Sequence, residues 1–169
     1  MTGVQTCALP ISRYQRYQYD QNLDKGVLLK SMVCTIVCVA TVAVWIGQMK
    51  DTDAAVGFLE RYGITLVGTI AIYIGCCFGL FEYCGPLPRA FFGVAGALAA
   101  ALATQHISAQ ILPVFLSLGI PWLLGFVVFL GAASSFLELE LQEAGLFAVF
   151  TLGLRVILKF TLFEQMFGS

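Results

Sequence analysis

A long stretch with almost no charge constrains this chain more than any other feature of its sequence. Between Tyr62 and Leu137 the only charged residues are Glu82 and Arg89. The whole chain is 59% hydrophobic and 11% charged, whereas an ordinary soluble domain has roughly 25% charged residues. We therefore expect a polytopic membrane protein. The net charge of -1 and the lack of a dense basic run in the sequence exclude nucleic acid as an expected partner.

The first residues look unlike a natural protein start. Residues 1–11, MTGVQTCALPI, resemble the conceptual translation of a common sequencing adapter. They carry no positive charge and their short apolar run is broken by Pro10, which disfavours a signal sequence. We expect residues 1–11 to be an artefact and the rest to be a piece of a longer protein. In that piece, residues 12–30 form a polar juxtamembrane segment and residues 31–169 a transmembrane helical domain.

The apolar runs predict the membrane spans, because a helix needs about 20 apolar residues to cross the hydrocarbon core. Four runs are clear and a fifth is ambiguous: 31–48, 62–83, 90–107, 111–133 and 144–167. In the fifth, Arg155 lies near the middle and Lys159 one turn later. Such a helix either crosses with its cations directed to the interface or lies flat in the interface, and we favour crossing. The predicted fold is an all-α bundle of four to five transmembrane spans.

The connections and the orientation follow from the remaining polar residues. Connections are predicted at 49–61, at the proline-rich break 84–89 and at 104–110. With the segment before the first span inside, five cationic residues face the cytoplasm and two face outward, namely Arg13, Arg16, Lys25, Lys30 and Arg89 against Lys50 and Arg61. This bias favours a cytoplasmic segment before the first span. The membrane expected is the inner or plasma membrane.

A polar pathway is the first candidate site. A cation near the bilayer centre is rarely kept without a partner, so we expect Arg155 and Lys159 to pair with glutamates inside the bundle. The candidate partners are Glu138, Glu140, Glu143 and Glu82. At helical spacing, Arg155 and Lys159 share a face with the small or polar residues Ala144, Ala148 and Thr151, and we expect this face to turn inward. The alternative places both cations at a helix end on the cytoplasmic face.

Pro121 adds to this candidate pathway. It lies inside the predicted fourth span, where a proline removes a backbone hydrogen bond and kinks or breaks the helix. Broken helices form substrate sites in many secondary transporters. Kinks also occur in spans without a transport role, so this alternative stays open.

Small residues predict where helices pack closely, because small-xxx-small stripes let backbones approach each other in lipid. The candidate contacts are Gly75 with Gly79 in the second span, and Gly93 with Ala97 and Gly96 with Ala100 in the third. The five cysteines after residue 11 are interpreted as packing residues, since they lie in or at the ends of apolar runs. The single histidine, His106, is interpreted as a polar residue of the connection at 104–110 rather than as a proton sensor.

The function predicted from these features is transport. The sequence holds no nucleotide, phosphate or nucleophile motif, and we expect no cofactor, no metal site and no soluble-type enzyme site. The first hypothesis is a transporter or channel component, or a fragment of one, that moves an ion or small solute. The alternative is a non-transporting subunit that anchors or assembles a larger complex, and a weaker one is a membrane-embedded enzyme. The expected partners are the lipid bilayer, further copies of the chain and other membrane subunits.

Overall fold

The computed structural model describes residues 13–81, 87–111 and 119–160, so the expectation for residues 1–11 lies outside it. These residues form five α-helices and no strand: α1 (Arg13–Gln48), α2 (Thr52–Gly79), α3 (Leu87–Ile111), α4 (Ile120–Leu137) and α5 (Leu141–Leu158). The predicted all-α bundle is confirmed.

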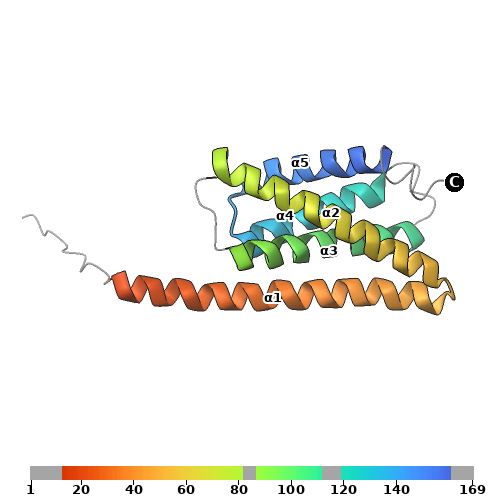
Figure 1. Ribbon diagram of the computed structural model, residues 1–169, viewed down its shortest axis with the longest axis horizontal. Helices are drawn as coiled ribbons and strands as arrows, with labels where there is room; N and C mark the ends of the chain where they lie inside the picture. Colours follow the sequence, from red (N-terminus) through yellow and green to blue (C-terminus); the bar gives the residue numbers. More distant parts are fainter. Residues whose placement is uncertain (1–12, 82–86, 112–118, 161–169) are drawn as a thin grey trace, which may run out of the picture.

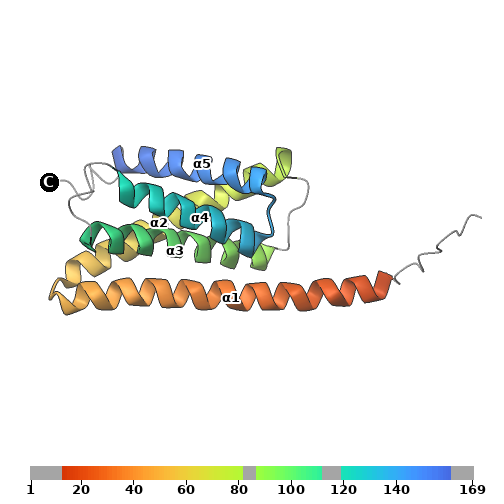
Figure 2. The same ribbon diagram turned by 180° about the vertical axis from the view of Figure 1, so that it is seen from behind.

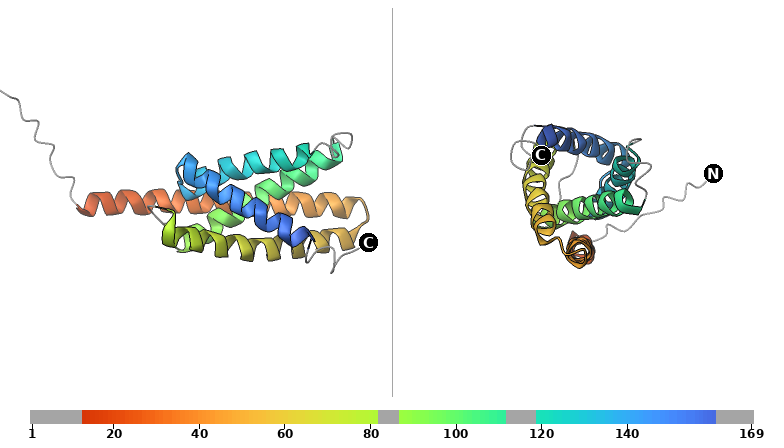
Figure 3. Two further views of the ribbon diagram at one scale, coloured as in Figure 1. Left: turned by 90° about the horizontal axis from the view of Figure 1, so that it is seen from above. Right: turned by 90° about the vertical axis from the view of Figure 1, so that its right-hand side faces the viewer.

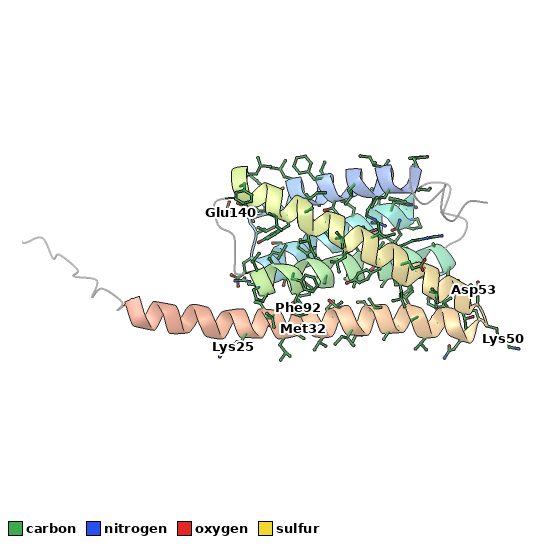
Figure 4. The ribbon with its side chains drawn as sticks, viewed as in Figure 1. Lys25, Met32, Lys50, Asp53, Phe92 and Glu140 are labelled. Atoms are coloured by element: carbon green, nitrogen blue, oxygen red, sulfur yellow. The ribbon has the colours of Figure 1, made fainter. Side chains whose placement is uncertain are left out.

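Helices α2 to α5 form an antiparallel ring, and α1 lies outside it against α3 (Figure 3). Around the ring, α3 and α5 are each neighbours of both α2 and α4. The bundle has two ends, which we name after residues labelled in Figure 4. The Lys50 end holds the α1–α2 turn, the end of α3, the start of α4 and the end of α5. The Glu140 end holds the end of α2, the start of α3 and the α4–α5 connection.

All five helices are long and apolar enough to cross a membrane. The outer surface of the bundle is also apolar: Val67 is 71% exposed, Val127 63% and Ile157 60%. A soluble monomer rarely exposes large contiguous apolar patches. Lipid tails would cover these side chains at no cost, so this surface supports a membrane location and the fifth predicted span.

The first two helices are longer than their predicted spans. Helix α1 runs without a break through the predicted juxtamembrane segment 12–30 from Arg13, and its first turns extend past the Glu140 end (Figures 1 and 2). At 36 residues and 1.5 Å per residue it is roughly 54 Å long, more than the roughly 30 Å hydrocarbon core. Helix α2 begins at Thr52, so the predicted connection 49–61 is mostly helical. The carboxylate of Asp51 caps it by accepting the Ala54 N–H at 3.1 Å.

The break between the third and fourth spans is displaced from the predicted position. Helix α3 continues through the predicted connection 104–110 and ends at Ile111. Helix α4 then begins at Ile120 with Gly119 as its N-cap at a φ of 69°, a value that glycine adopts without strain. Pro121 therefore lies in the first turn of α4, where its missing N–H would have no intrahelical partner in any case. The prediction that Pro121 kinks or breaks the interior of a span is therefore wrong, because this proline lies at the start of a helix.

The small residues of α3 pack against two helices. A Cβ added at Gly93 would lie 2.5 Å from the Leu137 side chain of α4, and one at Gly96 would lie 2.9 Å from the Ser31 carbonyl oxygen of α1. Ala97 is fully buried and Ala100 is half-buried. Met32 and Phe92, labelled in Figure 4, mark the region where α1 and α3 run side by side.

The expected contact through Gly75 and Gly79 is not made. Both residues lie on an exposed face of α2, and a Cβ at either position meets nothing within 4 Å. Two other glycines make close contacts instead: a Cβ at Gly68 would meet Leu154, and one at Gly125 would lie 3.1 Å from the Ala101 carbonyl oxygen. The small-xxx-small pattern is thus not sufficient to identify the face of α2 that packs.

Exchanging matched glycines tests this packing. We expect Gly96→Ala to lower the free energy of unfolding by about 1–3 kcal/mol, because the added methyl group pushes against backbone of α1. Gly75→Ala has open space and gains helix propensity, so its stability stays level or rises by up to about 1 kcal/mol. Titration of detergent-solubilised protein with dodecyl sulfate, followed by circular dichroism, measures both. Equal losses in the two variants would contradict the packing described.

Candidate functional site

A cavity of about 470 Å³ lies at the Lys50 end between α2, α3, α4 and α5. We call it the cationic cavity, because its described lining includes Arg61 of α2 together with Arg155 and Lys159 at the end of α5. The uncharged polar residues that line it are Tyr62, Thr65, Gln105 and His106. The apolar lining consists of Phe58, Leu102, Ala109, Pro121 and Trp122.

Arg155 is held in place by residues of two other helices. One of its guanidinium nitrogens donates a hydrogen bond to Oε1 of Gln105 on α3. Its Cζ lies 5.0 Å from the centre of the Trp122 ring of α4, within the range of a cation–π interaction. Arg155 thus connects α3, α4 and α5 at the Lys50 end. It lies in the last turn of α5 rather than near its middle, where a cation also interacts favourably with the helix dipole.

The charged side chains in the described lining of the cavity are all cations. Lys159 also lies over Trp122, with Nζ 5.7 Å from the ring centre. Among the residues that the structure describes, no carboxylate lines the cavity or lies within ion-pair distance of Arg155 or Lys159. The N-terminus of α4, at Gly119 and Pro121, adds the positive end of a helix dipole. The described lining of the cavity therefore carries an excess of positive charge.

Buried threonine hydroxyls lie between the cavity and the middle of the bundle. On α2, Thr65 lines the cavity and Thr69 lies one turn further in; on α5, Thr151 lies one turn further in than Arg155. All three threonines are 3% exposed or less. Thr65 and Thr69 donate to carbonyls one turn back, whereas the Thr151 hydroxyl has no hydrogen-bond partner within the described ranges.

Aromatic side chains occupy the next level of the ring. Phe147 of α5 lies 5.7 Å from Tyr73, 5.4 Å from Phe129 and 6.4 Å from Phe81 between ring centres. We call these four residues the aromatic cluster. Phe147 is fully buried and the other three are at most 8% exposed. The cluster fills the ring on the Glu140 side of the threonines, and none of its four residues lines the cationic cavity.

The predicted inward face of α5 is seen, but its glutamates lie at the other end of the bundle. Ala144, Ala148 and Thr151 are buried, as the helical spacing predicts. Glu140 and Glu143 start α5, where the Glu143 carboxylate accepts the Glu140 N–H at 3.2 Å and both charges favour the helix N-terminus. Some 15 residues separate Glu140 from Arg155, which is roughly 22 Å along the helix.

Glu138 has a different cationic partner from the one expected. Its carboxylate lies 2.6 Å from the guanidinium of Arg89, the buried first-turn arginine of α3. Glu138 itself caps the end of α4 at a φ of 53°, in the left-handed region that non-glycine residues seldom adopt. The expected pairing of Arg155 with the glutamates 138–143 is therefore not made, because the two groups occupy opposite ends of α5. Glu82 lies outside the described residues.

The described cysteines and the histidine are not gathered into a metal centre. No group of three or more histidine, cysteine or acidic residues converges among the described residues. Cys34 and Cys38 lie 3.8 Å apart between sulfurs on one face of α1. Cys77 is disulfide-bonded, so the packing role predicted for all five cysteines is wrong for this one. His106 lies within α3 and in the cavity lining, and its ring is 6.4 Å from that of Trp45.

Sequence reasoning missed Gln105 and Trp122 as site residues. Gln105 is predicted to lie in a connection, and Trp122, which lies inside the predicted fourth span 111–133, is not singled out. A signal was present in the helical spacing, since Leu102, Gln105, His106 and Ala109 lie on one face of a helix. This face is not apparent when residues 104–110 are taken as a connection, because helical spacing has no meaning in a loop.

The chain matches no protein-family model, no curated protein and no solved structure. Its class therefore rests on the features above: an all-α bundle of five helices apolar enough to span a membrane, with a cationic cavity at one end. What the protein does is argued from the geometry of that cavity.

The ion pair at the Glu140 end makes a testable prediction for stability. We expect Glu138→Gln to lower the free energy of unfolding by about 1–3 kcal/mol, because the buried Arg89 loses its charged partner. A fully buried pair would cost roughly 3–5 kcal/mol, but the Glu138 side chain is 41% exposed. The control is Glu60→Gln on the exposed face of α2. Thermal unfolding in detergent measures both variants, and indistinguishable midpoints would refute a structural role for the pair.

Proposed function

We propose that this protein is a membrane transport component that moves a small solute, and that the cationic cavity is its solute site. One observation carries the proposal: a charged cavity at one end continues into the bundle as buried hydroxyls. Polar groups inside a membrane bundle are costly and are typical of substrate pathways. The inward-facing Thr151, which lies between Arg155 and the aromatic cluster, is the group on which the continuation depends.

The mechanism follows from which parts of the ring are open and which are closed. A solute enters at the Lys50 end and reaches Arg155 and Gln105. Passage to the Glu140 end requires the aromatic cluster to open, which moves α5 relative to α2 and α4, because Phe147 contacts rings from both helices. Alternating access of this kind is the usual mode of secondary transporters. The Arg89–Glu138 pair joins α3 to the α4–α5 connection and would hold the far end closed.

A flux measurement tests transport directly. Purified protein is reconstituted into liposomes, and uptake of radiolabelled benzenesulfonate, a permanently charged anion, is followed down its gradient. We expect uptake above that of protein-free liposomes. Thr151→Val removes only the hydroxyl and should slow uptake by about three- to tenfold, the effect of one lost hydrogen bond in the path.

The matched control is Thr41→Val, since Thr41 lies on an exposed face of α1 outside the ring. Its uptake should equal that of the unchanged protein. Uptake no faster than in protein-free liposomes would contradict the transport proposal. Equal uptake in the two threonine variants would contradict the path through Thr151.

One observation favours a second candidate, a non-transporting subunit of a larger membrane complex. Helix α1 lies outside the ring and extends beyond it, and its apolar side chains Val33, Ile36 and Val37 are at least 50% exposed. A long peripheral helix of this kind suits contact with other subunits. The flux measurement discriminates, because this candidate predicts no uptake together with a stable association on native gels.

The orientation in the membrane remains a proposal, with the segment before α1 in the cytoplasm. The fold weakens the charge bias that supports this orientation. Arg155 and Lys159 lie at the Lys50 end with Lys50 and Arg61, so the count of cationic residues on the two sides becomes five against four instead of five against two. We expect Asp53→Cys to react with a membrane-impermeant maleimide in intact cells, and Lys25→Cys to react only after permeabilisation. Both residues are exposed, and Figure 4 shows them at separate places along the bundle. The reverse labelling pattern would invert the topology.

A further inference from the structure

We infer that the solute of the cationic cavity is an amphipathic oxyanion, a carboxylate, sulfonate or phosphate joined to an apolar body about the size of an aromatic ring. Its oxyanion would bind Arg155, and its body would lie against Trp122, Pro121 and Leu102. The inference rests on the proposed function in taking this cavity as the solute site, and it specifies the class of solute.

The first argument is the state of Arg155. A guanidinium has five N–H donors arranged to match an oxyanion. The contacts of Arg155 within the described residues are one hydrogen bond to the neutral Gln105 and the stacking on Trp122. Both contacts fix the orientation of the guanidinium, and neither neutralises its charge. Arg155 is thus positioned in advance, with donors left for a negatively charged ligand.

The second argument is the sign of the surroundings. Lys159 shares the Trp122 ring with Arg155, and the N-terminus of α4 points its dipole toward the same space. Pro121 has no N–H, and the N–H groups of Trp122 and Leu123 donate to the Gly119 carbonyl, so this terminus contributes its dipole rather than free backbone donors. In the part of the chain that the structure describes, the lining supplies no carboxylate to attract a cation. Charge therefore selects an anion.

The third argument is size and wall chemistry. A volume of about 470 Å³ lies within the range of small-molecule sites, roughly 300–1,000 Å³. A bare inorganic anion would leave most of it unfilled. The apolar part of the lining includes Phe58, Leu102 and Pro121, together with the Trp122 ring that both cations contact, and such walls favour an apolar body over a second polar group.

The two tryptophans of the chain make a direct binding assay available. In Trp45→Phe the remaining indole is that of Trp122, which lines the cavity. The probe is 4-bromobenzenesulfonate, whose bromine quenches tryptophan emission on contact, and the neutral comparison is 4-bromobenzenesulfonamide. Measurements are made on protein in nanodiscs of phosphatidylcholine. We expect saturable quenching by the sulfonate, and only weak, unsaturated quenching by the sulfonamide.

Variants of single cations identify the binding residue. Arg155→Gln should raise the apparent Kd of the sulfonate by about tenfold or more, the effect of removing a charged hydrogen bond. Arg155→Lys keeps the charge but lacks the planar donors, so its apparent Kd should lie between those of the unchanged protein and Arg155→Gln. Lys30→Gln is the control, since Lys30 is an exposed cation of α1 outside the cavity lining. Thermal unfolding and the unquenched Trp122 emission establish that each variant is folded.

A second arm distinguishes a free anion from a lipid as the source of the oxyanion. Nanodiscs containing phosphatidylglycerol are compared with those of phosphatidylcholine alone. Unchanged affinity for the sulfonate supports a free organic anion. A Kd that rises with the phosphatidylglycerol content, in the unchanged protein but not in Arg155→Gln, supports a lipid head group in the same site.

Equal quenching by the sulfonate and the sulfonamide, or the same Kd in Arg155→Gln and Lys30→Gln, would overturn the inference. Failure of this inference is separable from failure of the proposed function. Binding that requires Arg155, together with no flux in liposomes, would support the oxyanion site and contradict the transport proposal. Flux that is unchanged in Arg155→Gln would support the transport proposal and contradict the oxyanion site.

Discussion

The close approach of α3 to α1 and α4 is the constraint on which the rest of the structure depends. Lipid tails are as apolar as the helix surfaces, so burying apolar side chains supplies little force for association, and helices in a membrane associate largely through van der Waals contact. Such contact is greatest where backbones come close, and Gly93 and Gly96 permit this on two faces of one helix. Helix α3 thus becomes the common neighbour of α1, α2 and α4.

The contents of the ring differ along its length, and this difference produces the site. Toward the Glu140 end, the rings of Tyr73, Phe129 and Phe147 fill the space between α2, α4 and α5. Toward the Lys50 end, small or polar residues such as Thr65, Ala109 and Gln105 are among those that line the cavity. The charged groups near the ring also differ between its ends: Glu138 pairs with Arg89 and Glu140 and Glu143 start α5 at one end, whereas Arg61, Arg155 and Lys159 line the cavity at the other.

Individual residues show where sequence reasoning succeeded and where it did not. The spans were predictable because the length of an apolar run is a local property. The start of α2 at Thr52 had a local signal in its capping residue Asp51, but the many polar residues nearby favoured a loop. Pro121 was misplaced because a proline in the first turn of a helix and one in its interior differ only in where the helix begins.

An all-α membrane bundle, the faces of α3 that carry small residues and the inward face of α5 were all predictable from the sequence. Each of these is set by composition or by helical periodicity within a single segment. Which side chains from different helices meet depends on the tertiary structure. Gln105, Trp122 and Arg155 come from three helices, and their contact depends on the order of the helices in the ring and on their relative heights. Spacing along the chain encodes neither quantity. The geometry of a single helix also explains why Arg155 does not meet the glutamates at the start of α5: at 1.5 Å per residue they lie roughly 22 Å apart.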